Sequence, residues 1–234
     1  MSTRNKLQKF AEVLSYPNVF ENFNAKDKIL VGKNGAEVDY SNGWGDLFFN
    51  NSNPIVLELA CGRGEYSLEL ARRYPHKNFI GVDIKGARIW QGATFALNEK
   101  LENIAFLRTR IERISDFFLR GEIDEIWITF PDPFLRKSKS NRRLTSPNFI
   151  NHYRNILKQD GVINLKTDSP QLYEYSLETI ASDKKCKILY TKDDIYKDEL
   201  DFPDLDIKTY YEKMHLEDSR KIKYLRFLIN SQNE

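Results

Sequence analysis

Apolar residues along the chain gather in short runs that are separated by segments of helical periodicity. The run from Ile55 to Leu59 is too short for a typical helix and is rich in strand-forming side chains, as expected of a strand buried on both faces. Similar runs follow at 79–83, 104–107, 126–130, 161–166, 187–190 and 222–229. The alternation of strands and helices predicts an α/β fold with a doubly wound, mostly parallel sheet of seven strands.

Helix signals occupy the intervals between these runs. Leu70 and Tyr74 lie on one helical face, and Pro75 closes that helix. The pairs Ser146-Pro147 and Ser169-Pro170 each combine an N-cap residue with a proline suited to the first turn. We therefore expect helices to begin at both pairs.

The two ends of the chain differ from this middle region. Residues 6–15 predict a short amphipathic helix, and residues 31–45, with four glycines, predict an irregular lead-in. We therefore divide the chain into an N-terminal arm over 1–50 and one compact domain over 51–234. Within that domain, the acidic and aromatic stretch 193–211 has little periodicity and predicts a long functional loop.

Composition narrows the classes of function. The 36 basic and 34 acidic residues give a net charge of +2, so any affinity for nucleic acid must come from local clusters. Cys61 and Cys186 are far apart, and His76, His152 and His215 lack metal-ligand spacing. No apolar run approaches membrane-spanning length and no secretory signal is recognised. We expect a cytoplasmic protein with free thiols, no bound metal and no membrane association.

A turn of small residues follows the first apolar run. Gly62 and Gly64 would let a ligand approach backbone N–H groups, and Glu58 places a carboxylate beside them. Asp83 ends the next strand, near the spacing at which dinucleotide folds hold a ribose hydroxyl. Ser67 stands where a dinucleotide fingerprint requires its third Gly or Ala, so the turn departs from that fingerprint. The alternatives are an ordinary strand-to-helix turn for the glycines and a helix cap for Asp83.

The pattern E-x-A-x-G-x-G over residues 58–64 resembles the first motif of the class I S-adenosylmethionine-dependent methyltransferases, which have a Rossmann-like fold. The resemblance implies that S-adenosylmethionine is the cofactor. Its methionine moiety would lie against the glycine turn and its ribose would bind Asp83.

The most specific stretch runs from Ile128 to Phe149. Pro131 and Pro133 fix the backbone around Asp132, so this carboxylate would be held at the carboxyl edge of the sheet. Five cations follow with no acid among them: Arg136, Lys137, Lys139, Arg142 and Arg143. Such a run is usually a solvated loop, but its position next to a presumed reaction centre favours contacts with phosphate.

Together these motifs resemble the bacterial tRNA (guanine-N7-)-methyltransferase family over roughly Leu47 to Ile229. The motifs that carry the resemblance are F-P-D-P-F at 130–134, N-R-R-L at 141–144, K-T-D at 166–168 and T-Y-Y-E at 209–212. The resemblance implies methyl transfer to N7 of a guanosine in the tRNA variable loop, with tRNA as the partner and no obligate protein partner. It makes 51–234 the methyltransferase domain.

The resemblance also implies roles for individual residues. The cofactor pocket would contain Glu58, Gly62, Gly64, Asp83, Arg110 and Asp132, with Asp132 also catalytic. The tRNA would contact Asp168, Thr209 and Glu212 as well as the five cations that follow Asp132. Arg110 departs from the family, which usually has an acid there to accept from the adenine amino group. Arg136 replaces a usual lysine, and Phe134 replaces the commoner tryptophan.

The chemistry needs no general base, because guanine N7 is an unprotonated acceptor that can attack a sulfonium methyl directly. Two alternatives stay open. One is a methyltransferase acting on an exocyclic base amine, whose signature the order Pro131-Asp132-Pro133 interrupts. The other is an RNA-binding protein with the same fold that has lost catalysis.

Overall fold

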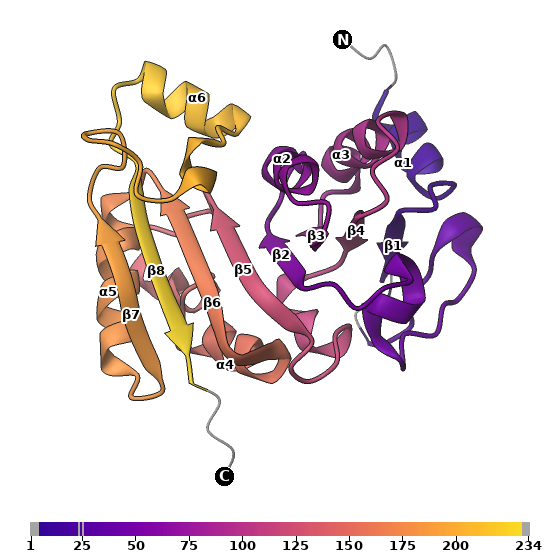
Figure 1. The fold of residues 1–234 in the computed structure, drawn as a ribbon, viewed down its shortest axis with the longest axis horizontal. Coiled ribbons are helices and arrows are strands. Elements are labelled where there is room, and N and C mark those ends of the chain that lie inside the picture. The colour runs from indigo at the N-terminus through magenta and orange to yellow at the C-terminus, as the bar shows by residue number, and fades with distance from the viewer. Residues whose placement is uncertain (1–4, 23, 25, 231–234) are drawn as a thin grey trace. The chain divides into compact units, whose positions relative to one another are not determined.

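The computed structural model describes residues 5–22, 24 and 26–230. It divides into two compact units, one extending to Leu119 and the other beginning at Arg120. Figure 1 labels the helices and strands of both units. None of the helices in the described residues combines the length and apolar character needed to cross a bilayer.

The first unit is built on four parallel strands. They are β1 (Val19–Glu21), β2 (Ile55–Leu59), β3 (Asn78–Asp83) and β4 (Ile104–Arg108), in the order β1-β4-β3-β2. Every residue of β2 and β3 is buried, which explains why most of their side chains are apolar. The register pairs Glu58 with Gly81 and Asp83 with Arg108, so the carboxyl ends of these strands share one edge.

Helices and helical turns precede, connect and follow these strands. They are α1 (Lys6–Val13), η1 (Lys33–Gly35), η2 (Gly45–Phe49), α2 (Glu65–Arg73), α3 (Gly86–Asn98) and η3 (Ile111–Asp116). Asn5 caps α1 through a capping box with Gln8. The indole Nε1 of Trp90 in α3 donates to the Glu12 carboxylate of α1 at 2.7 Å. Residues of the predicted N-terminal arm thus pack on α3.

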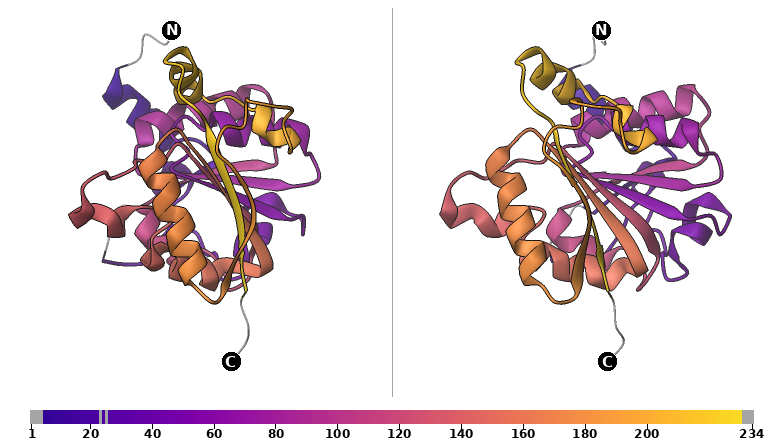
Figure 2. Two further views of the ribbon diagram at one scale, coloured as in Figure 1. Left: turned by 90° about the vertical axis from the view of Figure 1, so that its left-hand side faces the viewer. Right: turned by 60° about the vertical axis from the view of Figure 1, so that its left-hand side comes forward.

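The second unit combines parallel and antiparallel strands. Its strands are β5 (Ile123–Thr129), β6 (Leu157–Thr167), β7 (Cys186–Lys192) and β8 (Lys223–Ile229), in the order β5-β6-β8-β7. β5 and β6 are parallel, whereas β8 runs antiparallel to both of its neighbours. Its helices are η4 (Lys137–Arg142), α4 (Pro147–Ile156), α5 (Pro170–Ser182), η5 (Pro203–Asp206) and α6 (Tyr210–Glu217). Figure 2 shows α5 running along the strands of this unit, against which it packs.

The α/β class and the mostly parallel strands are confirmed, and the described residues form eight strands instead of the predicted seven. The additional strand is β1, which lies within the predicted arm and pairs with β4. The predicted loop over 193–211 also contains η5 and the start of α6. Ser146 stands at the N-cap of α4, but its hydroxyl donates to the Asn141 carbonyl and makes no capping bond.

Candidate functional site

In the first unit, the turn after β2 adopts a left-handed backbone. Ala60, Gly62 and Gly64 have φ angles of 59°, 58° and 69°. This conformation costs glycine little, which accounts for two of the three positions. The Gly64 N–H donates to the Cys61 carbonyl at 2.8 Å, and Gly64 then forms the N-cap of α2.

The ring of Phe106 in β4 packs against this turn and against Gly92 of α3. A Cβ at Gly64 would lie 2.5 Å from Cε1 of the ring, and one at Gly92 would lie 2.8 Å from Cζ. A Cβ at Gly62, by contrast, would meet no atom within 4 Å. Packing therefore leaves no room for a side chain at Gly64 and Gly92, whereas Gly62 faces open space that a ligand can fill.

Two of the three predicted cofactor carboxylates, Glu58 and Asp83, are bonded to the backbone around this turn. Glu58 is 2% exposed, and its Oε2 accepts from the Ser67 N–H at 3.0 Å and from the Ser67 hydroxyl at 2.5 Å. Asp83 accepts from the Gly62 N–H at 2.9 Å and from the Lys85 N–H at 2.8 Å. The two acids hold the turn in place, and their contact with a cofactor stays a prediction.

A polar atom that the sequence did not single out lies at the same strand edge. Thr109 directly follows β4, is 3% exposed, and its Oγ1 has no hydrogen-bond partner in the described part of the chain. A buried hydroxyl without a partner is costly, which suits a position that bonds to a bound ligand. Arg110, the residue predicted for this role, has an exposed side chain at the N-cap of η3. The only sequence signal for Thr109 is its place directly after a strand.

Cys61 lies within this turn and is buried. Burial, followed by the charges of Glu58 and Asp83, raises the pKa of its thiol well above the usual value. The thiol is therefore protonated near neutral pH, and Cys61 does not supply a nucleophile.

In the second unit, the segment after β5 holds Asp132 between two aromatic residues with unusual backbones. Phe130 and Phe134 have φ angles of 49° and 41°, in a region that bulky side chains rarely adopt. The Phe130 N–H donates to the Lys166 carbonyl of β6 at 2.9 Å. Asp132 is exposed. Backbone strain of this kind concentrates at functional sites.

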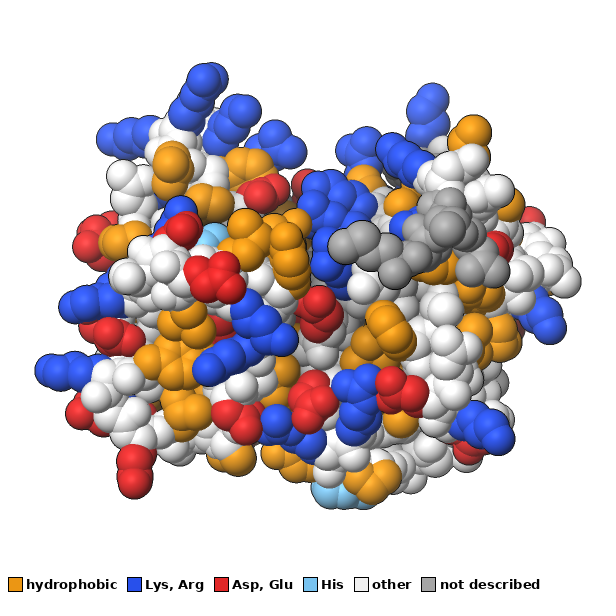
Figure 3. Space-filling view, turned by 90° about the horizontal axis from the view of Figure 1, so that it is seen from above, with side chains coloured by type: hydrophobic (Ala, Val, Ile, Leu, Met, Phe, Trp, Pro, Cys, Tyr) orange, Lys and Arg blue, Asp and Glu red, His pale blue; other side chains and the backbone are white. Residues whose placement is uncertain are grey.

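The predicted basic loop coincides with η4 and its two flanking residues. The exposed members are Arg136, Lys137, Lys139 and Arg142. Arg143 differs from them because it is 7% exposed. Four of the five cations are therefore available to phosphate, and the fifth is not. Figure 3 shows Lys and Arg side chains projecting from the surface of the molecule as seen from above.

The K-T-D and T-Y-Y-E motifs meet in a buried ion pair. The Lys166 Nζ donates to the Glu212 carboxylate at 2.9 Å, and both side chains are fully buried. It also donates to the carbonyls of Leu205 and Ile207, at 3.1 and 3.0 Å. The Tyr196 hydroxyl donates to the second Glu212 oxygen at 2.7 Å. Glu212 is thus occupied within the protein, and its predicted contact with tRNA stays untested.

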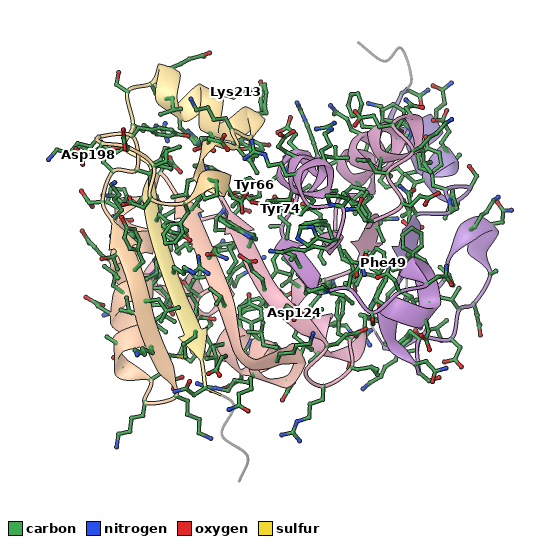
Figure 4. All side chains as sticks on the ribbon, in the orientation of Figure 1. Phe49, Tyr66, Tyr74, Asp124, Asp198 and Lys213 are labelled. Atoms are coloured by element: carbon green, nitrogen blue, oxygen red, sulfur yellow. The ribbon has the colours of Figure 1, made fainter. Side chains whose placement is uncertain are left out.

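The remaining predicted contacts lie around α6. The Thr209 hydroxyl accepts from the Glu212 N–H at 3.2 Å and caps this helix. Asp168 accepts from Arg220 at 2.7 Å, and His215 Nδ1 lies 3.7 Å from the same carboxylate oxygen. Lys213 of α6 is exposed, and Figure 4 shows its side chain at the surface. The Arg220 side chain that pairs with Asp168 is exposed, so a substrate could displace it.

Comparisons with known proteins agree with these motifs. The sequence model of the family described as putative methyltransferase matches residues 52–225. The tRNA (guanine-N(7)-)-methyltransferase of Christiangramia forsetii is 45% identical over 98% of this chain and all of its own length. The protein of the same name from Bacteroides fragilis is 46% identical, covering 99% of this chain and 88% of its own.

Solved structures share the fold at low sequence identity. The 16S rRNA methyltransferase KamB superposes with a TM-score of 0.61 at 15% identity, covering 83% of this chain and 96% of its own. The 16S rRNA (adenine(1408)-N(1))-methyltransferase of Catenulisporales acidiphilia, solved with SAM, gives 0.59 at 15% identity, covering 88% and 98%. The fold is that of the S-adenosylmethionine-dependent methyltransferases. The relatives that match at 45–46% identity over nearly the whole chain carry one and the same name. The chain belongs to the tRNA (guanine-N7-)-methyltransferase family.

Proposed function

We propose that this protein transfers the methyl group of S-adenosylmethionine to N7 of a guanosine in the variable loop of tRNA. The observation that carries the proposal is the 45% identity to a relative named for this activity, over the whole length of that relative. The proposed compartment is the cytoplasm, where the protein would act on tRNA without a membrane or an obligate protein partner.

The cofactor site of the proposal lies in the first unit. Gly62 offers open space beside its backbone, and Thr109 offers a buried hydroxyl without a partner among the described residues. Asp83 would bind the ribose with the carboxylate that now holds the Gly62 N–H. Glu58 would support the turn indirectly by fixing Ser67 in the first turn of α2. When bound, S-adenosylmethionine supplies an electrophilic methyl group on a sulfonium centre.

The reaction requires no general base, and the second unit has to supply only a fixed carboxylate. The lone pair of guanine N7 forms the new bond to carbon as the sulfur–carbon bond breaks, and no proton is released. Positive charge appears on the purine, so a fixed carboxylate stabilises the transition state. Asp132 is the candidate, because the strained segment from Phe130 to Phe134 fixes its backbone. Alignment of the reacting atoms supplies the rest of the rate gain.

The tRNA would be held by charge and by a displaceable ion pair. The exposed cations of the basic loop suit phosphate contacts, which position an RNA without reading its sequence. Asp168 can accept from the N1–H and amino group of guanine once Arg220 moves away, because a guanidinium and this guanine edge both present N–H donors.

The test is to identify the methylated nucleoside. We would incubate the purified protein with unmodified bulk tRNA and S-adenosylmethionine, digest the RNA, and map the product by mass spectrometry. The expected product is 7-methylguanosine at one position of the variable loop. A methyl group on an exocyclic amine would establish the first alternative reaction. Binding of tRNA without any methylation would instead establish a protein that has lost catalysis.

A further inference from the structure

Arg143 does not behave like the rest of the basic loop. Its neighbour Arg142 is exposed, with its guanidinium 4.8 Å from the centre of the Phe134 ring. Arg143 is 7% exposed, although it carries the same charge one residue further on. A buried guanidinium must find partners inside the protein, because the loss of hydration is costly.

The partners of Arg143 are the backbone carbonyls that directly follow Asp132. Its Nε donates to the Pro133 carbonyl at 3.0 Å, and its Nη2 donates to the Phe134 carbonyl at 3.1 Å. The guanidinium also lies 4.3 Å from the centre of the Tyr175 ring in α5. A planar fork can hold two adjacent carbonyls in fixed directions, which a lysine ammonium cannot do.

These carbonyls belong to a segment that needs external support. Phe134 has a φ of 41°, a conformation that is unfavourable for a residue with an aromatic side chain. Strained backbones of this kind persist only where surrounding contacts determine them. The two bonds from Arg143 are such contacts, and they act one and two residues after Asp132.

The backbone of Arg143 is itself fixed. Its N–H donates to the Ser140 carbonyl at 3.0 Å, and its carbonyl accepts from the Ser146 N–H at 2.9 Å. The next carbonyl, that of Leu144, accepts from the Tyr153 hydroxyl of α4 at 2.9 Å. The guanidinium therefore links the Asp132 segment to an anchored part of the second unit.

We propose that Arg143 is a positioning residue that holds the carboxylate of Asp132 in place through the carbonyls of Pro133 and Phe134, and that it is not a phosphate contact. This inference rests on the proposed function, because it concerns the orientation of the proposed catalytic group. It separates the five cations of the basic loop into four that face RNA and one that faces the protein.

The first test compares Arg143→Lys with two control variants. For Arg143→Lys we expect the single-turnover rate at saturating tRNA and cofactor to fall by about tenfold or more. The reason is that a lysine ammonium cannot hold the two carbonyls in the fixed directions set by the planar guanidinium. The dependence of log tRNA affinity on log salt should keep its slope. Arg142→Ala should make that slope shallower by about 0.7–0.9 units, as for one lost phosphate contact. Arg120→Lys, at an exposed arginine of the same unit, should leave the rate unchanged.

A second test asks whether Arg143 acts through Asp132. If it does, adding Arg143→Lys to Asp132→Asn should lower the rate no further than Asp132→Asn alone. Rate losses that multiply would overturn the inference, as would a normal single-turnover rate in Arg143→Lys or a shallower salt slope in that variant.

A third test keeps the inference separate from the proposed function and from simple unfolding. Arg143→Lys should speed amide hydrogen exchange at Phe130, whose N–H donates to the Lys166 carbonyl, without changing exchange in β8. If Arg143→Lys does not fold, Tyr175→Leu removes the ring beside the guanidinium and should give a smaller fall in rate. A wild-type protein that forms no 7-methylguanosine would defeat the proposed function, whereas unchanged exchange at Phe130 would defeat the positioning role.

Discussion

At the scale of single residues, the two glycines of one turn differ in what an added side chain would meet, which is open space at Gly62 and the Phe106 ring at Gly64. Gly62→Ala should cost about 1–2 kcal/mol of stability, because a side chain is introduced at a left-handed residue. Since its Cβ would enter open space, it should also weaken S-adenosylmethionine binding by about tenfold, or ~1.4 kcal/mol.

Gly64→Ala is the matched comparison, because its Cβ would collide with the Phe106 ring. Overpacking should add about 1–3 kcal/mol to the same backbone cost. Urea unfolding and calorimetric titration with S-adenosylmethionine would measure both effects. Equal cofactor affinities in wild type and Gly62→Ala would show that no ligand group lies against Gly62.

The carboxylate of Asp132 should matter for the chemical step more than for binding. Asp132→Asn keeps the size of the side chain but removes its charge, so turnover should fall by about 10²–10³ with a small change in tRNA affinity. Asp124→Asn is the control, because Asp124 lies in β5 and pairs with Lys158 at 2.7 Å. Figure 4 labels Asp124. A near-normal single-turnover rate in Asp132→Asn would reduce Asp132 to a turn residue.

At the scale of elements, the buried pair of Lys166 and Glu212 ties α6 to β6. Burial lowers the pKa of Lys166, and the charge of Glu212 opposes that shift. Removing one partner of a buried pair leaves the other uncompensated, so Lys166→Met should destabilise the protein by about 3–5 kcal/mol.

Lys213→Met provides the control on α6 itself, where the side chain is exposed and a change within about 0.5 kcal/mol is expected. Chemical denaturation monitored by circular dichroism would compare the two variants. Equal stabilities would mean that neither the ion pair with Glu212 nor the carbonyl bonds of the Lys166 ammonium stabilise this segment.

At the scale of the whole molecule, a net charge of +2 cannot by itself account for tRNA binding. Replacing Lys137, Lys139 and Arg142 with Gln should make the plot of log affinity against log salt shallower by about two to three units. The same replacement at Lys184, Lys185 and Lys187, which are exposed, changes the net charge equally. If both triple variants changed the slope to the same extent, overall charge would govern binding and the basic loop would have no special role.

The sequence predicted those parts of the fold whose pattern is local. Apolar runs marked seven strands, but β1 has only three residues and owes its place to pairing with β4. The helix α6 escaped prediction because Tyr210, Tyr211 and Met214 are among its exposed residues while Glu212 is buried, the reverse of an amphipathic pattern. The role proposed for Arg143 depends on carbonyls about ten residues away, which no spacing in the chain reveals.

The short strand β1 has a consequence for the handling of this protein. It covers the outer side of β4, whose residues Ile104 to Leu107 are fully buried. A truncation that begins at Asn22 would turn β4 into an open, apolar edge strand, the kind of edge that pairs with other chains. Such a shortened protein should form concentration-dependent oligomers in light scattering even while it keeps its cofactor turn. Strand β1 is therefore expected to protect the edge of β4 from pairing with other chains.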